Sequence, residues 1–290
     1  MRITELFDKT ERTFSFEFFP PKDEISAVDF GINVGQLINL DPTFVTVTYG
    51  AGGSNQERTF SLVDYLQNKI GLNTMAHYTC VGAGRDKIRK DMEYLQKIRI
   101  ENLMLLRGDP PKGSTEFFAP ENGFSFASDL ISFVKEKFSF SVGAAAYPEK
   151  HPESGSLDDD IQRLKIKCDS GADFLITQLF FDNEAYYRFV QKAKKVGINH
   201  RIIPGIIPIT NYKQIKRYVE MTSATFPADL LDRLETHQES PDKIYQIGID
   251  HAIKQCLDLL ESGAPGIHFY TLNKSRAAVE VFESLPRMIR

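Results

Sequence analysis

Short runs of apolar and β-branched residues recur along the chain at intervals of roughly thirty residues. Several of them are apolar almost throughout, which is typical of parallel strands that are covered on both faces. The eight runs cover residues 13–19, 43–49, 74–80, 102–106, 140–146, 173–180, 201–206 and 266–271. We therefore expect eight parallel strands.

Segments with a helical period lie between these runs. In residues 86–98, the side chains of Ile88, Met92, Leu95 and Ile98 share one helix face. Residues 157–168 and 184–196 repeat the pattern. Alternation of eight strands with helices predicts an α/β fold of the TIM-barrel type, a (β/α)8 barrel. A doubly wound sheet also alternates strands and helices, but it is the second choice because no convincing dinucleotide fingerprint is present.

The chain has 290 residues, a length that one barrel accommodates. No low-complexity tract or linker divides it, and the regular spacing is interrupted only at residues 221–240, before the last long helix. We therefore expect a single domain over residues 1–290.

Composition narrows the class of protein. Hydrophobic residues make up 42% and charged residues 26%, which is ordinary for a globular protein, and the net charge of −4 argues against nucleic-acid binding. The three cysteines, Cys80, Cys168 and Cys256, form no CxxC pair and suit a reducing compartment. Residues 1–9 lack the apolar segment of a signal peptide, and no run is long enough to cross a membrane. We expect a cytoplasmic protein without nucleic-acid or membrane partners.

Polar residues collect where the predicted strands end. In a (β/α)8 barrel the active site lies at the C-terminal ends of the strands, so residues from distant parts of the sequence converge there. The residues in question, with the glycines and prolines beside them, are Glu17, Thr48, Tyr49, His77, Arg107, Gly108, Asp109, Tyr147, Pro148, Glu149, His151, Gln178, Pro204, Gly205, Tyr270 and Asn273. This set marks the expected site.

Glu17 stands between Phe16 and Phe18 in the first strand. Alternate residues of a strand point to opposite faces, so the carboxyl group points away from both phenyl rings. In a barrel that direction leads into the mouth; the plainer interpretation is an exposed glutamate on an edge strand.

Two further features have competing interpretations. His77 and His151 are possible metal ligands, but no third ligand stands at metal-like spacing, and we expect no metal site. In the segment Arg107-Gly108-Asp109-Pro110-Pro111, the glycine lets the backbone approach a ligand closely. An adhesion loop of the Arg-Gly-Asp kind is disfavoured by the buried strand that precedes it. We expect the carboxylate of Asp109 to lie beside Arg107.

Seven collinear segments resemble methylenetetrahydrofolate reductase along essentially the whole chain. Singly they are modest strings, but in this order they are specific. They are TFSFEFFPP (13–21), FVTVTYGAGG (44–53), RGDPP (107–111), AAYPEKHPES (145–154), ITQLFFD (176–182), IIPGIIPITNYKQ (202–214) and HFYTLNKS (268–275). The length resembles that of the bacterial catalytic domain.

The resemblance implies a barrel that binds non-covalent FAD at the C-terminal face of the strands. It also implies NADH or NADPH as the hydride donor and reduction of 5,10-methylenetetrahydrofolate to 5-methyltetrahydrofolate, a step of one-carbon metabolism that feeds methionine synthesis. NAD(P)H and folate would use the flavin in turn, with ping-pong kinetics. We also expect a homo-oligomer.

The resemblance further assigns residues. The implied catalytic residues are Glu17, as the acid with a raised pKa, and Asp109. The implied flavin contacts are Thr48, Tyr49, Ala51, His77, Arg107, Gly108, Asp109, Ala127, Tyr147, His151, Ser154, Asp160 and Lys167. The implied folate contacts are Asp109, Gln178, Tyr212, Tyr270 and Lys274.

Five positions depart from the pattern common in the family. Lys274 stands in place of an arginine and offers a point charge instead of a bidentate fork. Tyr212 replaces a phenylalanine and Phe126 a tyrosine, while Arg163 and Ile166 replace a polar pair. These departures concern single contacts and leave the implied function in place.

Two other classes remain open from the sequence. A pterin-binding barrel that transfers groups without a redox cofactor, as in pteroate synthesis, would purify colourless. A flavin-binding barrel without folate activity, such as a proline-dehydrogenase-like enzyme or a non-catalytic partner of another reductase, would be yellow. Methylenetetrahydrofolate would not reoxidise the flavin of that second class.

Overall fold

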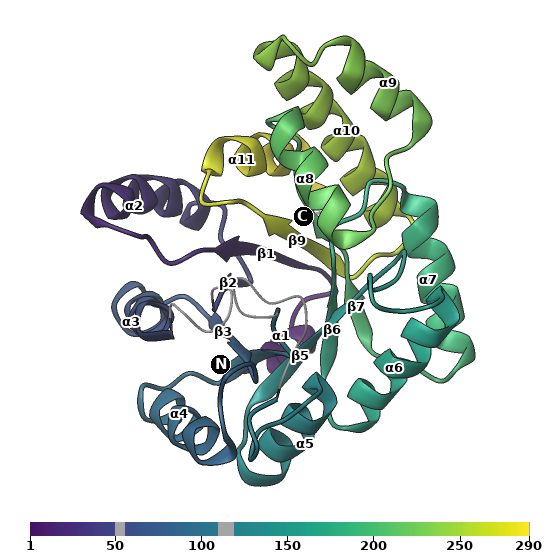
Figure 1. The fold of residues 1–290 in the computed structure, drawn as a ribbon. Coiled ribbons are helices and arrows are strands. Elements are labelled where there is room, and N and C mark those ends of the chain that lie inside the picture. Colours follow the sequence, from purple (N-terminus) through teal and green to yellow (C-terminus); the bar gives the residue numbers. More distant parts are fainter. Residues whose placement is uncertain (50–55, 110–118, 290) are drawn as a thin grey trace.

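The strands form one parallel sheet that curls into a barrel (Figure 1). The computed structural model describes residues 1–49, 56–109 and 119–289. Its strands are β1 (Thr13–Phe18), β2 (Phe44–Val47), β3 (Thr74–Thr79), β4 (Asn102–Leu106), β5 (Ser141–Ala146), β6 (Phe174–Thr177), β7 (Arg201–Ile203), β8 (Gly205–Ile206) and β9 (Gly266–Tyr270). They are ordered β7-β6-β5-β4-β3-β2-β1-β9-β8, and every pair is parallel.

The two ends of the sheet meet at Pro204. The sequence predicts one strand over residues 201–206, but the structure divides it into β7, which pairs with β6, and β8, which pairs with β9. Proline has no N–H to donate to a strand ladder. Its carbonyl still accepts a hydrogen bond from the N–H of His268 at 2.9 Å. The chain therefore changes partner strand at this residue, and the predicted (β/α)8 barrel is confirmed.

Helices surround the sheet. They are α1 (Ile3–Phe7), α2 (Glu24–Ile38), α3 (Gln56–Tyr65), α4 (Arg85–Lys97), α5 (Ala127–Lys137), α6 (Leu157–Asp169), α7 (Asn183–Lys195), α8 (Tyr212–Thr222), α9 (Ala228–Thr236), α10 (Pro241–Glu261) and α11 (Ser275–Ser284). A π-helical segment, η2 (Leu66–Ile70), follows α3, and a 3-10 turn, η3 (Arg287–Ile289), follows α11. The three helices predicted from periodicity, at residues 86–98, 157–168 and 184–196, agree with α4, α6 and α7 to within one residue at each end.

The irregular segment at residues 221–240 contains α9. This helix stands outside the ring of helices, against α8 and α10, at the upper edge of Figure 1. Leu230 and Leu234 of α9 are buried in a second apolar cluster with Ile215 of α8 and Ile244 of α10. The interruption in the pattern is therefore one extra helix with a small core of its own.

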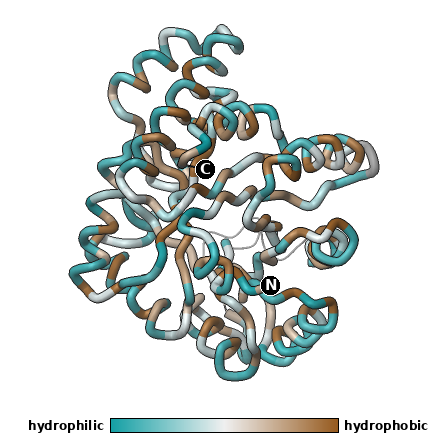
Figure 2. The backbone as a smooth tube through the Cα atoms, turned by 180° about the vertical axis from the view of Figure 1, so that it is seen from behind, coloured by the Kyte–Doolittle hydropathy of each residue, from teal (hydrophilic) through white to brown (hydrophobic). Residues whose placement is uncertain are grey.

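Alternate side chains of each strand enter two different cores. Phe16 and Phe18 of β1 point outward into the main core between sheet and helices, as do Val45 and Val47 of β2. Figure 2 shows hydrophobic segments running along the inner elements and hydrophilic ones along the outer sides of the helices. Burial on both faces accounts for the nearly continuous apolar runs in the sequence.

The N-terminal end of the barrel is filled by apolar side chains. Phe174 of β6 and Met104 of β4 belong to an interior cluster that Ile3 of α1 completes from below. The ring of Phe7, also in α1, packs edge-on against Phe174 with ring centroids 5.3 Å apart. Because α1 closes this end, a ligand-binding site is expected at the other end, where the strands finish.

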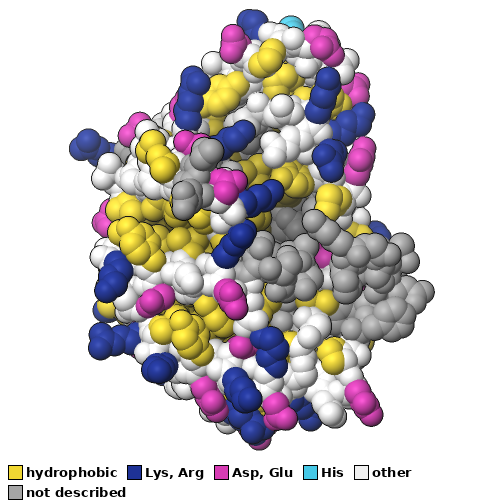
Figure 3. Space-filling model, turned by 60° about the vertical axis from the view of Figure 1, so that its left-hand side comes forward, with side chains coloured by type: hydrophobic (Ala, Val, Ile, Leu, Met, Phe, Trp, Pro, Cys, Tyr) yellow, Lys and Arg dark blue, Asp and Glu magenta, His cyan; other side chains and the backbone are white. Residues whose placement is uncertain are grey.

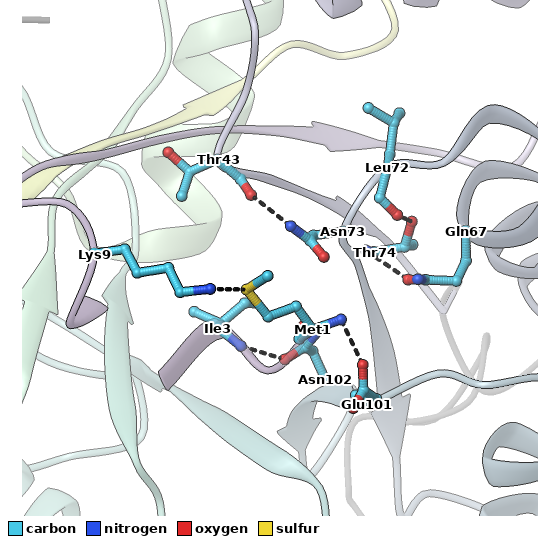
Figure 4. A network of polar contacts seen from close by, with 10 residues as sticks. All are labelled: Met1, Ile3, Lys9, Thr43, Gln67, Leu72, Asn73, Thr74, Glu101 and Asn102. Atoms are coloured by element: carbon cyan, nitrogen blue, oxygen red, sulfur yellow. Dashed lines mark hydrogen bonds and ion pairs between the residues drawn. The ribbon is translucent and has the colours of Figure 1, made fainter. Parts of the chain in front are cut away.

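Several polar atoms at this closed end are paired with one another (Figure 4). The N–H of Ile3 donates to Oδ1 of Asn102 at 2.7 Å, and Nδ2 of Asn102 donates to the carbonyl of Met1 at 3.0 Å. The N-terminal ammonium lies 2.5 Å from Oε2 of Glu101. One asparagine thus satisfies two backbone groups that burial would otherwise leave unpaired.

Charged side chains of both signs are interspersed over the described part of the face in Figure 3. This distribution matches the small net charge of −4. Among the described residues, no helix combines the length and the apolar character needed to cross a membrane.

Candidate active site

Glu17 lies inside the mouth of the barrel. It is 6% exposed and faces the interior, opposite the outward rings of Phe16 and Phe18. Its register partners are Thr46 on β2 and Tyr270 on β9. The structure therefore agrees with the direction that the sequence predicts, and the interpretation as an exposed edge glutamate is wrong.

Glu17 and His77 form a buried pair of neutral groups. Oε2 of Glu17 lies 3.7 Å from Nε2 of His77, which is beyond hydrogen-bond distance. Burial raises the pKa of Glu17 from 4.5 to about 8 and lowers that of His77 from 6.5 to about 4. Near neutral pH the carboxyl group therefore carries its proton and the imidazole does not. Glu17 is therefore a buried proton donor among neutral groups, and it does not form an ion pair with His77.

Tyr270 forms the neighbouring wall of this pocket. Its hydroxyl donates to the carbonyl of Thr177 at 2.6 Å, which fixes the ring across the barrel mouth. Burial raises its pKa well above the ordinary value, with a smaller contribution from Glu17. A Cβ atom on Gly205 would lie 2.6 Å from Cε2 of Tyr270 and 2.3 Å from the carbonyl oxygen of Thr177. Only glycine leaves room for the tyrosine in this position.

Four buried polar atoms on β2, on β3 and directly after β2 have no hydrogen-bond partner among the described residues. They are Oγ1 of Thr46, Thr48 and Thr79 and Nε2 of His77. Thr46 and Thr48 alternate with the outward Val45 and Val47, so both face the barrel interior. An unpaired buried polar group costs about 1–3 kcal/mol. Their concentration on one side of the mouth marks a surface that a polar ligand would complete.

The sequence interpretation includes Thr48 and His77 but misses Thr46 and Thr79. The signal was present, because residues two apart on a strand share a face. Elsewhere in the described chain the unpartnered atoms are scattered, at Ser141, Asn183 and His200.

Arg107 is held by a residue that the sequence interpretation misses. Its guanidinium donates to both carboxylate oxygens of Glu153, at 2.7 and 2.6 Å. The pKa of Arg107 is raised, mainly by its hydrogen bonds to Glu153. The charge of Asp109 also raises it, but contributes least. The expected neighbour Asp109 is exposed, three residues after the end of β4. Nothing in the spacing of the residues identifies Glu153, because the pair joins two loops 46 positions apart.

Gly108 adopts a backbone conformation that glycine accepts more readily than other residues, as its place between Arg107 and Asp109 led us to expect. Its φ is +91°, in the left-handed region that side chains disfavour. A Cβ atom there would lie 2.8 Å from Cγ1 of Val81 and 3.0 Å from Cβ of Thr79. The loop after β4 therefore packs directly on the end of β3.

The predicted residues after β5 form one connected cluster. The rings of Tyr147 and His151 meet edge-on at 4.8 Å. Asp160 accepts hydrogen bonds from the N–H of His151 at 3.2 Å and from Oγ of Ser154 at 2.9 Å. Lys167 donates to the carbonyl of Ala145; burial lowers its pKa, and the nearby Asp160 opposes that shift. The cluster places a lysine, a histidine and two hydroxyl groups beside the mouth.

The side chains of Tyr49 and Tyr212 are not brought into the mouth. The side chain of Tyr49 is buried on the outer side, with its ring 4.9 Å from that of Tyr78, so any ligand contact would come from its backbone. Tyr212 lies in the second apolar cluster, and its hydroxyl donates to Glu235 of α9 at 3.1 Å. Ala127 is the half-buried first residue of α5. Ala51 lies outside the described residues.

Two predicted folate contacts lie near the ends of β6 and β9. Gln178 is half-buried directly after β6, and its Oε1 accepts the N–H of Leu179 at 2.9 Å. Lys274 is exposed and lines a hollow with Tyr270 and Ile207. The departing residues Phe126, Arg163 and Ile166 are all exposed. Among the residues that the structure describes, no group of His, Cys, Asp and Glu side chains is arranged to hold a metal.

These features define a class: an α/β barrel with a polar binding site at the C-terminal ends of its strands and a buried, neutral carboxylic acid within it. The family model of methylenetetrahydrofolate reductase matches residues 2–286. The chain belongs to the methylenetetrahydrofolate reductase family.

Relatives extend over nearly the whole chain. The chain is 35% identical to "Methylenetetrahydrofolate reductase (NADH) 1" of Arabidopsis thaliana, covering 98% of this chain and 50% of that protein. It is 36% identical to the "5,10-methylenetetrahydrofolate reductase" of Escherichia coli, over 93% of this chain and 90% of that one. The chain thus spans half the length of the plant relative and most of the bacterial one.

A solved structure supports the fold. An uncharacterized protein from Clostridium thermocellum, described as binding two copies of 5-methyl-5,6,7,8-tetrahydrofolic acid, superposes with a TM-score of 0.65 at 16% identity. The match covers 96% of this chain and 95% of that one. At this identity the likeness establishes the barrel architecture alone.

Proposed function

We propose that this chain reduces 5,10-methylenetetrahydrofolate to 5-methyltetrahydrofolate with NADH or NADPH as donor and FAD as the bound cofactor. The observation that carries the proposal is Glu17, a carboxylic acid buried in the barrel mouth with a pKa of about 8. Opening the five-membered ring of the substrate requires a proton on a weakly basic nitrogen. An acid that keeps its proton near neutral pH is suited to that step.

The residues of the mouth fit a flavin. The ring system, ribityl chain and diphosphate of FAD present many hydrogen-bonding atoms, and Thr48 and His77 offer buried polar atoms that lack partners. On the other side, Arg107 and the half-buried Lys167 supply positive charge for a diphosphate. Bound FAD would accept a hydride from NAD(P)H and pass it on to the folate.

Each remaining residue has a role that follows from its place. Tyr270 and Gln178, at the ends of β9 and β6, would form the wall against which the folate ring lies. Asp109, three residues after the end of β4, would accept hydrogen bonds from the pterin edge. Lys274 is an exposed cation at the rim and suits the anionic glutamate tail of a folate. Tyr212 is less suited than the sequence predicts, because Glu235 holds its hydroxyl.

The organisation of the protein is part of the proposal. We infer one domain over residues 1–290 that acts as a homo-oligomer in the cytoplasm. The relatives include one named for NADH, from Arabidopsis thaliana, and one named for NADPH, from Caenorhabditis elegans, and we propose that this chain uses a donor of the same class.

The visible spectrum of the purified protein tests the proposal. We expect a yellow protein that releases FAD on denaturation, bleaches when NADH or NADPH is added without oxygen, and regains its colour with methylenetetrahydrofolate. A colourless protein, or release of FMN alone, would exclude the proposed cofactor. A flavin that bleaches but is not reoxidised by the folate would leave a flavoprotein with a different substrate.

A further inference from the structure

The end of β1 that carries Glu17 is tied to the loop after β9 by two side chains. Oδ1 of Asn273 accepts a hydrogen bond from the N–H of Phe19, and its Nδ2 donates to the carbonyl of Phe19, both at 2.8 Å. Oγ1 of Thr271 donates to the carbonyl of Glu17 at 2.6 Å and accepts the N–H of Asn273 at 3.1 Å. Thr271 and Asn273 thus form a clasp, which joins segments 254 positions apart.

The clasp takes over where backbone pairing stops. The register between β1 and β9 ends at Glu17 and Tyr270. Phe19 is followed by Pro20 and Pro21, which have no N–H, so Phe19 holds the last backbone donor of this strand end. The amide of Asn273 makes both hydrogen bonds that a backbone neighbour would otherwise make.

The clasp residue also has an unusual backbone. Asn273 has φ +59° and the preceding Leu272 has φ +50°, so two successive residues with side chains adopt the left-handed conformation. Such conformations cost free energy and persist where the surroundings hold them, often at functional sites. Asparagine tolerates this region better than most residues, and here its side chain also has both of its hydrogen bonds.

We propose that Asn273 is a positioning residue that fixes Glu17 in the barrel mouth through the backbone of Phe19. On its other side, the same strand end is held by β2, where the N–H of Thr48 donates to the carbonyl of Phe18 at 2.9 Å. Beyond the last β1–β9 register pair, Glu17 and Tyr270, the clasp is what holds this end against the β9 side; without it we expect residues 18 and 19 to stay attached to Thr48 and to move away from β9. Water then reaches the carboxyl group.

The groups that face Glu17 are neutral. His77 on β3 and Tyr270 on β9 lie against it, with His268 interacting with His77 and Tyr147 with Tyr270. Each of these is held by burial in its uncharged form at neutral pH. Exclusion of water is therefore what sets the proton affinity of Glu17, and that exclusion depends on the strand end staying closed.

That Glu17 gives its proton to the folate rests on the proposed function. That the clasp positions Glu17 rests on the hydrogen bonds alone. The test compares Asn273→Gly, which keeps the left-handed backbone but removes both hydrogen bonds, with Asn273→Ala. The matched control is Asn33→Ala on α2. Oδ1 of Asn33 accepts the N–H of Ser275 at 2.8 Å, so this change removes an asparagine contact to the start of α11, directly after the same loop, without touching Phe19.

The first readout is the pKa of Glu17, measured by carbon-13 NMR of glutamate-labelled protein, with Glu17→Gln to assign the signal. We expect the pKa to fall by about one unit or more in both Asn273 variants, because solvation favours the charged form, and to stay unchanged in Asn33→Ala. An unchanged pKa in Asn273→Gly would overturn the inference. A shift in Asn273→Ala alone would assign the effect to backbone conformation and would overturn it as well.

The second readout is the pH profile of flavin reoxidation by methylenetetrahydrofolate. We expect its alkaline limb to move to lower pH by the same shift as the pKa in the Asn273 variants, while flavin reduction by NADH keeps its profile. A shifted pKa with an unshifted limb would overturn the use of this carboxyl group as the acid and leave the clasp standing. A wild-type protein with no folate reaction would contradict the proposed function, whereas the NMR measurement would still decide the clasp.

Discussion

The two ends of the barrel differ in how their buried polar atoms are satisfied. At the closed end, Asn102 pairs with the N–H of Ile3 and the carbonyl of Met1, and apolar rings fill the remaining space. At the open end, the hydroxyls of Thr48 and Thr79 and a nitrogen of His77 have no hydrogen-bond partner in the described part of the chain. The exception at the closed end is the hydroxyl of Ser141. The same strands therefore carry mostly paired polar atoms at the closed end, called the floor below, and unpaired ones at the open end, the mouth.

The difference shows how function and stability divide along one strand. β1 contributes Ser15 near the floor, where its hydroxyl is hydrogen-bonded to Nδ1 of His268 at 2.8 Å, and Glu17 two residues later, where the carboxyl group has no such partner. Two positions on the same strand face therefore differ: the hydroxyl of Ser15 has a hydrogen-bond partner, whereas burial shifts the pKa of Glu17. Such shifted groups cluster at functional sites.

The largest expected effect belongs to Glu17. Replacement by glutamine keeps the size but removes the transferable proton, so folate reduction should fall by about 10²–10⁴-fold. Flavin reduction by NADH, measured separately by stopped flow, should stay within about tenfold because hydride transfer from the nicotinamide needs no acid. A parallel loss in both half-reactions would show that Glu17 positions the flavin or supports the fold.

The floor should respond in stability and leave ligand binding intact. Asn102→Ala leaves the buried N–H of Ile3 without a partner, which should lower the free energy of unfolding by about 1–3 kcal/mol. Denaturant titration of the flavin-free protein measures this change. The FAD dissociation constant of the variant should equal that of the wild type, and a weakened FAD affinity would contradict the division between floor and mouth.

In the mouth we expect the reverse, a substitution that weakens FAD binding and leaves stability intact. Thr48→Val removes a buried hydroxyl that has no partner, so the flavin-free protein should be as stable as the wild type or slightly more so. FAD affinity should weaken by up to about tenfold, the equivalent of one hydrogen bond. Isothermal titration with FAD gives this value. Lower stability with unchanged affinity would mean that the hydroxyl is bonded within the protein.

The smallest change in stability is expected for Asp109→Asn, because the residue is exposed. Removing its negative charge should raise the reduction potential of the bound flavin and slow the folate half-reaction more than NADH oxidation. Glu136→Gln near the C-terminal end of α5, with a side chain 70% exposed, is the control for a surface charge at the closed end of the barrel. Unchanged potential and unchanged folate kinetics would remove Asp109 from the site.

Local rules of sequence predict much of this arrangement. Alternation in β1 gives the direction of Glu17, and the same rule applied to β2 and β3 would have found Thr46 and Thr79. The break in residues 201–206 was also visible, because proline cannot continue a strand ladder.

What the sequence could not predict depends on tertiary packing. Glu153 meets Arg107 only because the loops after β4 and β5 are adjacent in the barrel. Tyr212 donates to Glu235 because α9 folds back onto α8, and no local pattern specifies where an inserted helix packs. The clasp of Asn273 on Phe19 joins the two ends of the chain in the same way.

The pH dependence of the two half-reactions tests the central claim most directly. The folded-state pKa of Glu17, about 8, lies above its ordinary 4.5, so the proton donor is present below pH 8 and is lost as the pH rises through that value. We predict that the rate constant of flavin reoxidation by methylenetetrahydrofolate falls about tenfold per pH unit above pH 8, and that flavin reduction by NADH does not show this limb. A folate step that stays constant from pH 7 to 10, or a limb shared by both half-reactions, would contradict the assignment of Glu17 as the acid.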